Sequence, residues 1–373
     1  MNWNDPAPGE EIAGERSWEV VRAAWKEREP VTHREPRRRW PLVALAAAAA
    51  VVAATVTPPG RAVLGSLRDA VGTSEDHVLS LPASGQILVN TPGGAWIVHA
   101  DGSKRFLSGY ADAAWSPHAL YVAAARGNTL VAMEPNGTVH WKLARRGPIG
   151  APQWSFEGFR IAYLARAELR IVNGDGTGDR RLSANAVGTG LPAYAWRPAT
   201  HQLAYRTATD RVALVDVDSR RVLWARKVKG VERLLWSDGG RRLLVVAETP
   251  LLLDARGKTV ARLPTPGTIV GAAFRPHSES LALAVDRGGR SAVILRSGAR
   301  LSRARQIFSG VGAFAGVAWA PNGRWILVDW SAADQWVFVR VLPTPRVRIV
   351  SDVNAIFRTG PEHFGALAGW CCP

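Results

Sequence analysis

The sequence predicts an all-β protein, a β-propeller of four-stranded blades, preceded by N-terminal helices that include one transmembrane helix. Three observations predict this fold. An aromatic residue followed by a turn and an apolar strand recurs about every 40 residues, a period typical of propeller blades. Asn-Gly and Asp-Gly turns separate the strands, and one uncharged stretch rich in Ala and Val precedes the repeats.

Residues 1–39 are predicted to be a cytoplasmic tail that contains an amphipathic helix. Within residues 16–28, the side chains of Trp18, Val21 and Trp25 share one face, and charged residues take the other. Two interpretations stay open. The helix rests on the inner leaflet of a membrane, or it docks a cytoplasmic partner through these three side chains.

Residues 40–57 are predicted to form the transmembrane helix. The stretch from Trp40 to Val56 carries no charge, although at about 1.5 Å per residue it is slightly short of a ~30 Å hydrocarbon core. Arginines crowd its N-terminal flank, and an Arg excess on one short flank orients that flank to the cytoplasm. We therefore expect a single-pass cell-membrane protein with an extracytoplasmic C-terminal domain. A cleaved or soluble form is the alternative.

Residues 58–83 are predicted to form a juxtamembrane helix and a linker. Apolar residues of this segment fall on one side of the helix: Val63, Leu64, Leu67, Ala70 and Val71. We expect the helix to lie on the outer membrane surface or to pack under the next domain.

Residues 84–373 are predicted to be the propeller. In each repeat an aromatic residue ends one strand, a turn follows, and three more strands complete the blade. These aromatic anchors are expected to fill the gap between stacked blades: Trp115, Trp154, Trp196, Trp236, Phe274, Trp319 and Trp370. The first six lie 38 to 45 residues apart. Trp370 follows after 51, which a loop over Ser351–His363 accounts for.

Six repeats suggest six blades at first count, but the two ends of the domain complete a seventh. Residues 85–109 predict three strands of a blade that lacks its first strand. The segment Ala368–Pro373 matches a first strand that ends in its anchor, Trp370. Pairing this strand with the N-terminal three would close the ring and leave no open edge. We therefore expect seven blades, with six as the alternative.

Three phrases in the repeats are more specific: Trp115-Ser116-Pro117, Trp154-Ser155 with Ile161-Ala162-Tyr163, and Trp319-Ala320-Pro321-Asn322-Gly323. They resemble the WD40-like β-propeller repeats of the bacterial TolB type, and the resemblance covers about residues 84–373. Similar repeats occur in solute-binding scaffolds, partner-docking modules and the gating propellers of serine peptidases. The resemblance therefore implies the fold and little about the chemistry.

No catalytic motif accompanies the repeats. The patterns G-x-S-x-G, H-E-x-x-H, P-loop and C-x-x-C are missing from the sequence, and the blades leave no room for a second catalytic domain. We expect no catalytic residue and no cofactor. The alternative is an envelope hydrolase or lyase whose carboxylates converge at the channel mouth.

Two features could suggest a metal, and both have simpler interpretations. The segment Asn173–Asp179 is rich in oxygen ligands, but it coincides with the turn between the third and fourth strands of every other blade. His118, His201 and His277 lie near the first turns of three different blades, where we expect exposed side chains. No metal site is predicted.

The net charge and the two cysteines limit the kinds of partner that the protein could have. The net charge is +16, and the excess falls after residue 60, so the propeller could face an anionic envelope component or an acidic protein. Scattered arginines on outer strands are the simpler explanation, and outside the cell no nucleic-acid partner is expected. Cys371 and Cys372 are the only cysteines. We expect two thiols, with a vicinal disulfide or an intermolecular bridge as alternatives.

These observations favour a binding, scaffold or sensor module. In the sharper hypothesis the propeller binds a protein or ligand outside the membrane, and the helix over residues 16–28 relays this to a cytoplasmic regulator.

Overall fold

The computed structural model describes residues 80–184, 193–342, 344–360 and 363–372. Residues 1–39 and 40–57 lie outside these ranges, as do Trp18, Val21 and Trp25 and the apolar residues 63–71 of the predicted juxtamembrane helix. Among the described residues, no helix is long and apolar enough to cross a membrane.

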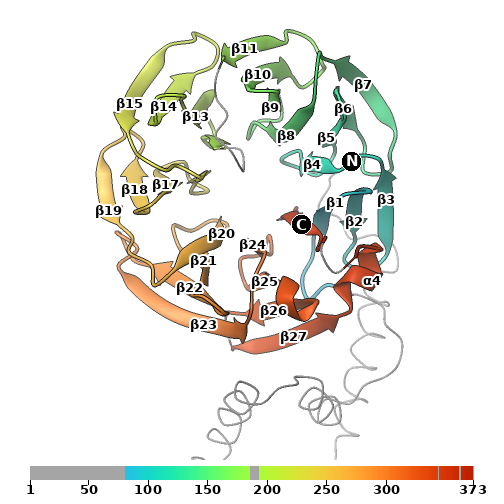
Figure 1. Cartoon of the computed structure of the whole chain (residues 1–373), viewed down its shortest axis with the longest axis vertical. Coiled ribbons are helices and arrows are strands. Elements are labelled where there is room, and N and C mark those ends of the chain that lie inside the picture. Colours follow the sequence, from blue (N-terminus) through green and yellow to red (C-terminus); the bar gives the residue numbers. More distant parts are fainter. Residues whose placement is uncertain (1–79, 185–192, 343, 361–362, 373) are drawn as a thin grey trace, which may run out of the picture. The chain divides into compact units, whose positions relative to one another are not determined.

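The described residues form seven four-stranded antiparallel sheets arranged as the blades of a ring (Figure 1). We name the blades A to G in chain order, each from its innermost strand outward. Blade A contains β28 (Ala366–Cys371), β1 (Gln86–Thr91), β2 (Gly94–Val98) and β3 (Lys104–Ser108). Blade B contains β4 (Asp112–Trp115), β5 (Val122–Arg126), β6 (Thr129–Met133) and β7 (Val139–Ala144). Blade C contains β8 (Ile149–Trp154), β9 (Arg160–Ala165), β10 (Glu168–Asn173) and β11 (Arg180–Ser183).

The other four blades continue the same order. Blade D contains β12 (Tyr194–Trp196), β13 (Gln202–Arg206), β14 (Arg211–Asp216) and β15 (Val222–Lys227). Blade E contains β16 (Arg233–Trp236), β17 (Arg242–Val246), β18 (Leu251–Asp254) and β19 (Thr259–Arg262). Blade F contains β20 (Thr268–Phe274), β21 (Leu281–Asp286), β22 (Arg290–Ser297) and β23 (Arg303–Val311). Blade G contains β24 (Gly316–Trp319), β25 (Trp325–Trp330), β26 (Gln335–Arg340) and β27 (Arg346–Ser351), with the 3-10 helix η1 (Ser331–Ala333) between β25 and β26.

The predicted seven-bladed propeller is confirmed, and the six-bladed alternative is wrong. Blade A is built from both ends of the domain, because β28 pairs with β1 in an antiparallel register that places Trp370 opposite Ile87. Gly85, just before β1, is required at this junction. A Cβ there would stand 2.6 Å from the carbonyl oxygen of Cys371, so the chain ends could not approach as closely.

The core is divided into seven hydrophobic clusters, one at each boundary between neighbouring blades. The middle strands read as nearly continuous apolar runs, such as Leu281–Asp286, because both of their faces are covered by neighbouring blades. Each aromatic anchor takes part in the cluster between its own blade and the preceding one. Stacking of blade on blade is therefore the main source of buried apolar area.

One segment differs from the sequence prediction. The expected loop Ser351–His363 contains a short helix, α4 (Val353–Phe357), whose Val353 and Phe357 are buried. The Phe357 ring lies 5.0 Å from that of Trp336 in blade G and 6.0 Å from that of Trp96 in blade A. The helix therefore forms because it packs between the first and last blades, on the outer side of the ring (Figure 1).

Candidate functional site

A buried serine closes the hairpin between the innermost and second strands in blades B and C, as Ser237 also does with Arg242 in blade E. In blade B the Ser116 N–H donates to the carbonyl oxygen of Tyr121, and its hydroxyl accepts from the Tyr121 N–H at 2.9 Å. In blade C, Ser155 makes the same pair of bonds with Arg160. Both serines are buried, so their hydroxyl oxygens hold the hairpins in one shape. The repeated Trp-Ser phrase thus has a structural cause.

The closed hairpins present apolar side chains to solvent in these two blades. Leu120 and Phe159 stand at the same position, four residues after the serine, and are 64% and 69% exposed. Tyr121 and Phe156 are also exposed. We call these four residues the hairpin patch.

The other hairpins carry polar residues at the position of Leu120 and Phe159. Five residues after the end of the innermost strand, blades D, E, F and G have His201, Arg241, Glu279 and Arg324. The backbone of the repeat therefore does not require an apolar residue there. Contiguous exposed apolar side chains on a soluble domain mark interaction sites, so blades B and C carry the candidate site.

The two hairpins lie side by side. The Tyr121 ring stacks on that of Trp154 in blade C, with a centroid distance of 6.3 Å and an interplanar angle of 24°. A Cβ on Gly158 would stand 3.8 Å from Pro117 Cδ, which places the two tips in contact. The hairpin patch is thus one surface and not two separate features.

The border of the patch is polar. The Tyr121 ring meets that of His140 edge-on at 5.1 Å, and His140 Nε2 lies 3.0 Å from Glu134 Oε1. An apolar centre with a polar rim is the usual anatomy of a protein–protein interface.

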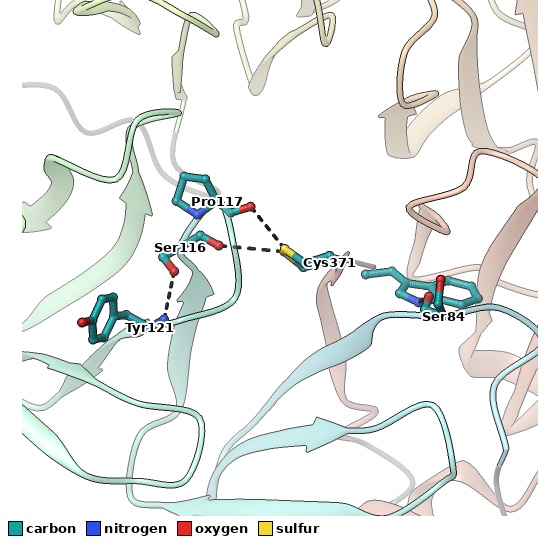
Figure 2. Close-up of a disulfide and its surroundings, with 7 residues drawn as sticks. Ser84, Ser116, Pro117, Tyr121 and Cys371 are labelled. Atoms are coloured by element: carbon teal, nitrogen blue, oxygen red, sulfur yellow. Dashed lines mark hydrogen bonds between the residues drawn. A yellow bond between two sulfur atoms is a disulfide. The ribbon is translucent and has the colours of Figure 1, made fainter. Parts of the chain in front are cut away.

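The C-terminal disulfide adjoins the patch. Cys371 and Cys372 are joined to each other, so the expectation of two free thiols is wrong. Cys372 Sγ lies 3.2 Å from the carbonyl oxygen of Pro117, and Cys371 Sγ lies 3.8 Å from that of Ser116 (Figure 2). The end of the ring-closing strand β28 therefore rests on the first hairpin of blade B.

The predicted anchors lie at the ends of the innermost strands. Trp196, Trp236, Trp319 and Trp370 are buried, whereas Trp115, Trp154 and Phe274 are half-buried. Three of the indole N–H groups bond to carbonyl oxygens, those of Trp196 to Gln153, Trp319 to Ala273 and Trp370 to Ser84. The structure thus brings none of these anchors together at one site; they are distributed around the ring.

The segment Asn173–Asp179 is the turn between β10 and β11. A Cβ on Gly176 would stand 2.7 Å from the ring of Trp141, so this glycine allows the turn to pack under an indole. Asp179 is engaged by Arg170 and Arg145 and accepts from the hydroxyl of Tyr163 at 2.5 Å. Burial raises the pKa of Asp179, but the hydrogen bonds from Arg170 and Tyr163 outweigh it, and its net pKa lies below the ordinary range.

The three turn histidines are exposed, as predicted, and they lie in blades B, D and F. His201 Nδ1 contacts Asp218 at 2.6 Å, and His277 Nδ1 lies 3.4 Å from Asp238. Within the described ranges, no group of three or more His, Cys, Asp or Glu side chains is placed to hold a metal ion.

Two of the cavities among the described residues lie away from the hairpin patch. One, of about 250 Å³, lies at the hairpin between β21 and β22 and is lined by Arg287, Arg290, Gln306 and Ser309. The other, of about 350 Å³, lies beside α4 and includes Trp96, Arg358 and His363. Neither lining contains a carboxylate, so neither pairs an acid with a base for hydrolysis or elimination.

No known family model and no curated protein matches the sequence. Solved structures do share the fold. The β-propeller domain of Cps50 (Swd1) from Myceliophteria thermophila is 15% identical with a TM-score of 0.51, covering 65% of this chain and 86% of that one. A chain of the mitotic checkpoint complex is 14% identical with a TM-score of 0.54, covering 70% and 96%.

A chain of hydrazine synthase from Kuenenia stuttgartiensis is also similar, at 12% identity and a TM-score of 0.51, covering 62% of this chain and 76% of that one. At these identities the likeness shows the fold alone. The chain is a seven-bladed β-propeller protein. The fold by itself does not decide between binding and catalysis.

Proposed function

We propose that this propeller is a non-catalytic scaffold that binds a protein partner through the hairpin patch. One observation carries the proposal: Leu120 and Phe159 are exposed where the other hairpins carry charged or polar residues. A buried serine already holds the hairpin in shape, so an exposed apolar side chain at its tip is not needed for the fold. The partner is expected to present apolar side chains, since the patch itself holds no charge.

The test uses substitutions that the repeat itself tolerates. Leu120→Arg with Phe159→Arg gives blades B and C the residue that blades E and G carry at this position. His201→Arg is the matched control, because it changes the same hairpin position in blade D. We expect that some proteins crosslink to the wild type and to the control but not to the double variant. A partner purified in this way should bind the double variant at least tenfold more weakly than the wild type. Unchanged affinity of that partner would contradict the proposal.

We further propose that the protein is anchored in the cell membrane, with the propeller outside and the tail inside. The support is the uncharged stretch over residues 40–57 and the arginine-rich flank before it. Protease added to intact spheroplasts should digest the propeller and leave residues 1–39 protected. A propeller protected until lysis would overturn this topology. We also propose that the repeats are of the bacterial TolB type.

The tail helix over residues 16–28 is proposed to dock a cytoplasmic regulator, which would make the propeller a sensor. Trp18→Ala with Trp25→Ala should abolish capture of that regulator while membrane insertion persists. If the double variant changes only the binding of a tail peptide to anionic vesicles, the helix rests on the membrane and the relay fails.

The positive net charge of the chain supports the proposal that the partner of the propeller is acidic. A net charge of +16 favours acidic proteins or anionic envelope components over basic ones. The association rate with the partner is therefore expected to fall as salt is raised, and a salt-independent rate would contradict this.

A further inference from the structure

The cavity beside α4 is bounded by blade A on one side and by the residues after the helix on the other. The hairpin between β1 and β2 closes one end through Thr91, Pro92 and Gly93. Arg358, Thr359 and Gly360 follow the helix and form the opposite wall. At about 350 Å³ it has the size of a small-ligand site.

The wall of this cavity is aromatic. The rings of Trp96 and Phe106 lie 4.6 Å apart on neighbouring strands, and Phe357 completes the wall at 6.0 Å from Trp96. Phe106 is 39% exposed, so part of this aromatic surface is open to solvent. An apolar or aromatic group could pack against this exposed part of Phe106.

Two cations converge on the same wall. The guanidinium carbon of Arg358 lies 5.9 Å from the centre of the Trp96 ring, and Lys104 Nζ lies 6.0 Å from it. Lys104 is held by a hydrogen bond to the carbonyl oxygen of Ile356 at 3.2 Å. Arg358 ends α4 in a left-handed conformation, and its N–H bonds to the carbonyl oxygens of Ala355 and Asn354.

These cations have no acidic partner among the described residues. Burial lowers the pKa of Lys104, and the charge of Arg358 lowers it further. Two like charges held close together repel each other, and an anion between them would relieve that repulsion. The cavity thus combines a site of unbalanced positive charge with an open aromatic surface.

We propose that this cavity binds a small organic anion, in which a carboxylate or phosphate group is joined to an aromatic or apolar body. The anionic group lies at Arg358, with Lys104 close by, and the apolar body packs on Phe106, the exposed ring of the aromatic wall. The guanidinium group can donate hydrogen bonds to two oxygens of such an anion at once. This site is separate from the hairpin patch, so it adds a ligand to the protein partner proposed above.

The test measures binding of phenyl phosphate to the full chain by calorimetry, with benzoate, inorganic phosphate and phenol as comparison probes. Phenyl phosphate or benzoate is expected to bind at least tenfold more tightly than inorganic phosphate and phenol, because only these two engage both halves of the cavity. The preference between them identifies the phosphate or the carboxylate as the anionic group. If neither binds more tightly than inorganic phosphate or phenol, the proposal is overturned.

Variants assign the binding to this cavity. Arg358→Ala should reduce affinity for the preferred probe at least tenfold, and Arg358→Lys should restore part of it. Phe106→Ser should weaken the preferred aromatic probe while leaving inorganic phosphate unchanged. Arg105→Ala is the matched control, because Arg105 follows Lys104 on β3 and points to the opposite face of the blade. An equal loss in Arg105→Ala, or no loss in Arg358→Ala, would show that binding reflects the general positive charge and would refute the site.

Discussion

The indole N–H of Trp370 donates a hydrogen bond to the carbonyl oxygen of Ser84 at 3.2 Å, joining positions 286 residues apart. The same ring meets Phe338 of blade G edge-on at 5.6 Å. One side chain therefore links the innermost strand of blade A to the segment that leads into β1 and to the last blade. The closure of the ring depends on a contact that no local segment of the chain could make.

Trp370→Ala is expected to destabilise the propeller by about 3–5 kcal/mol, because it removes a buried aromatic side chain that the structure cannot refill. Denaturant unfolding followed by tryptophan fluorescence would measure it. Ala368→Ser, at an exposed position of the same strand, is the control and should change little. A loss below about 1 kcal/mol for Trp370→Ala would mean that the ring does not depend on this contact.

Ser155→Ala should cost about 1–3 kcal/mol, because it removes the buried hydroxyl that accepts from the part-buried N–H of Arg160. Thermal unfolding would report the loss. Ser108→Ala tests the same substitution at an exposed position on β3 and should be neutral. Equal effects of the two substitutions would show that the hydroxyl does not close the hairpin.

Asp179→Asn should destabilise the protein at neutral pH by about 1–3 kcal/mol, because Arg170 and Arg145 lose their shared carboxylate. The pKa of Asp179 is lowered in the folded state, so its contribution is present above the ordinary value of 3.8 and is lost as the pH falls below it. The difference in free energy of unfolding between wild type and variant should therefore shrink under acid. A difference that does not change with pH would contradict this assignment.

Asp329→Asn should have the opposite effect and stabilise the protein at neutral pH. Asp329 is completely buried, which raises the pKa of its carboxyl well above the ordinary value of 3.8, although a hydrogen bond from the indole of Trp336 opposes this. The folded state then binds the proton more tightly, so wild-type stability falls as the pH rises above that value.

The amide variant keeps an oxygen that can accept from Trp336 and removes this loss. Its advantage should therefore grow as the pH rises from 4 to 7. Unfolding curves between pH 4 and pH 7 would measure the trend. An advantage that stays constant over this range would refute the pH dependence.

The blades could be predicted from the sequence because each repeats one pattern and needs only its neighbours to pack. The C-terminal strand could be assigned to the first blade because Trp370 occupies the same place in that pattern as the other anchors. Helix α4 could not be predicted. It has five residues and no side-chain cap, so only the packing of Val353 and Phe357 between two blades holds it.

The hairpin patch was missed for a different reason. Its signal was present in the aligned repeats, where Leu120 and Phe159 replace the polar residues of other hairpins. The repeat pattern is defined by the residues that the blades share, so it does not mark the hairpin position at which blades B and C differ from the others. The disulfide was not expected because the Cα atoms of adjacent residues, here 3.7 Å apart, are closer than in most disulfides.

Seven similar blades offer a bound protein seven rotational settings that differ little in backbone shape. The apolar tips at Leu120 and Phe159 occur on two adjacent blades, which leaves one setting in which a partner covers both. Two side chains would thus fix the direction in which a bound protein points around the ring axis. Moving the apolar pair to the hairpins of blades E and F should turn the partner by three blades without changing the scaffold beneath it.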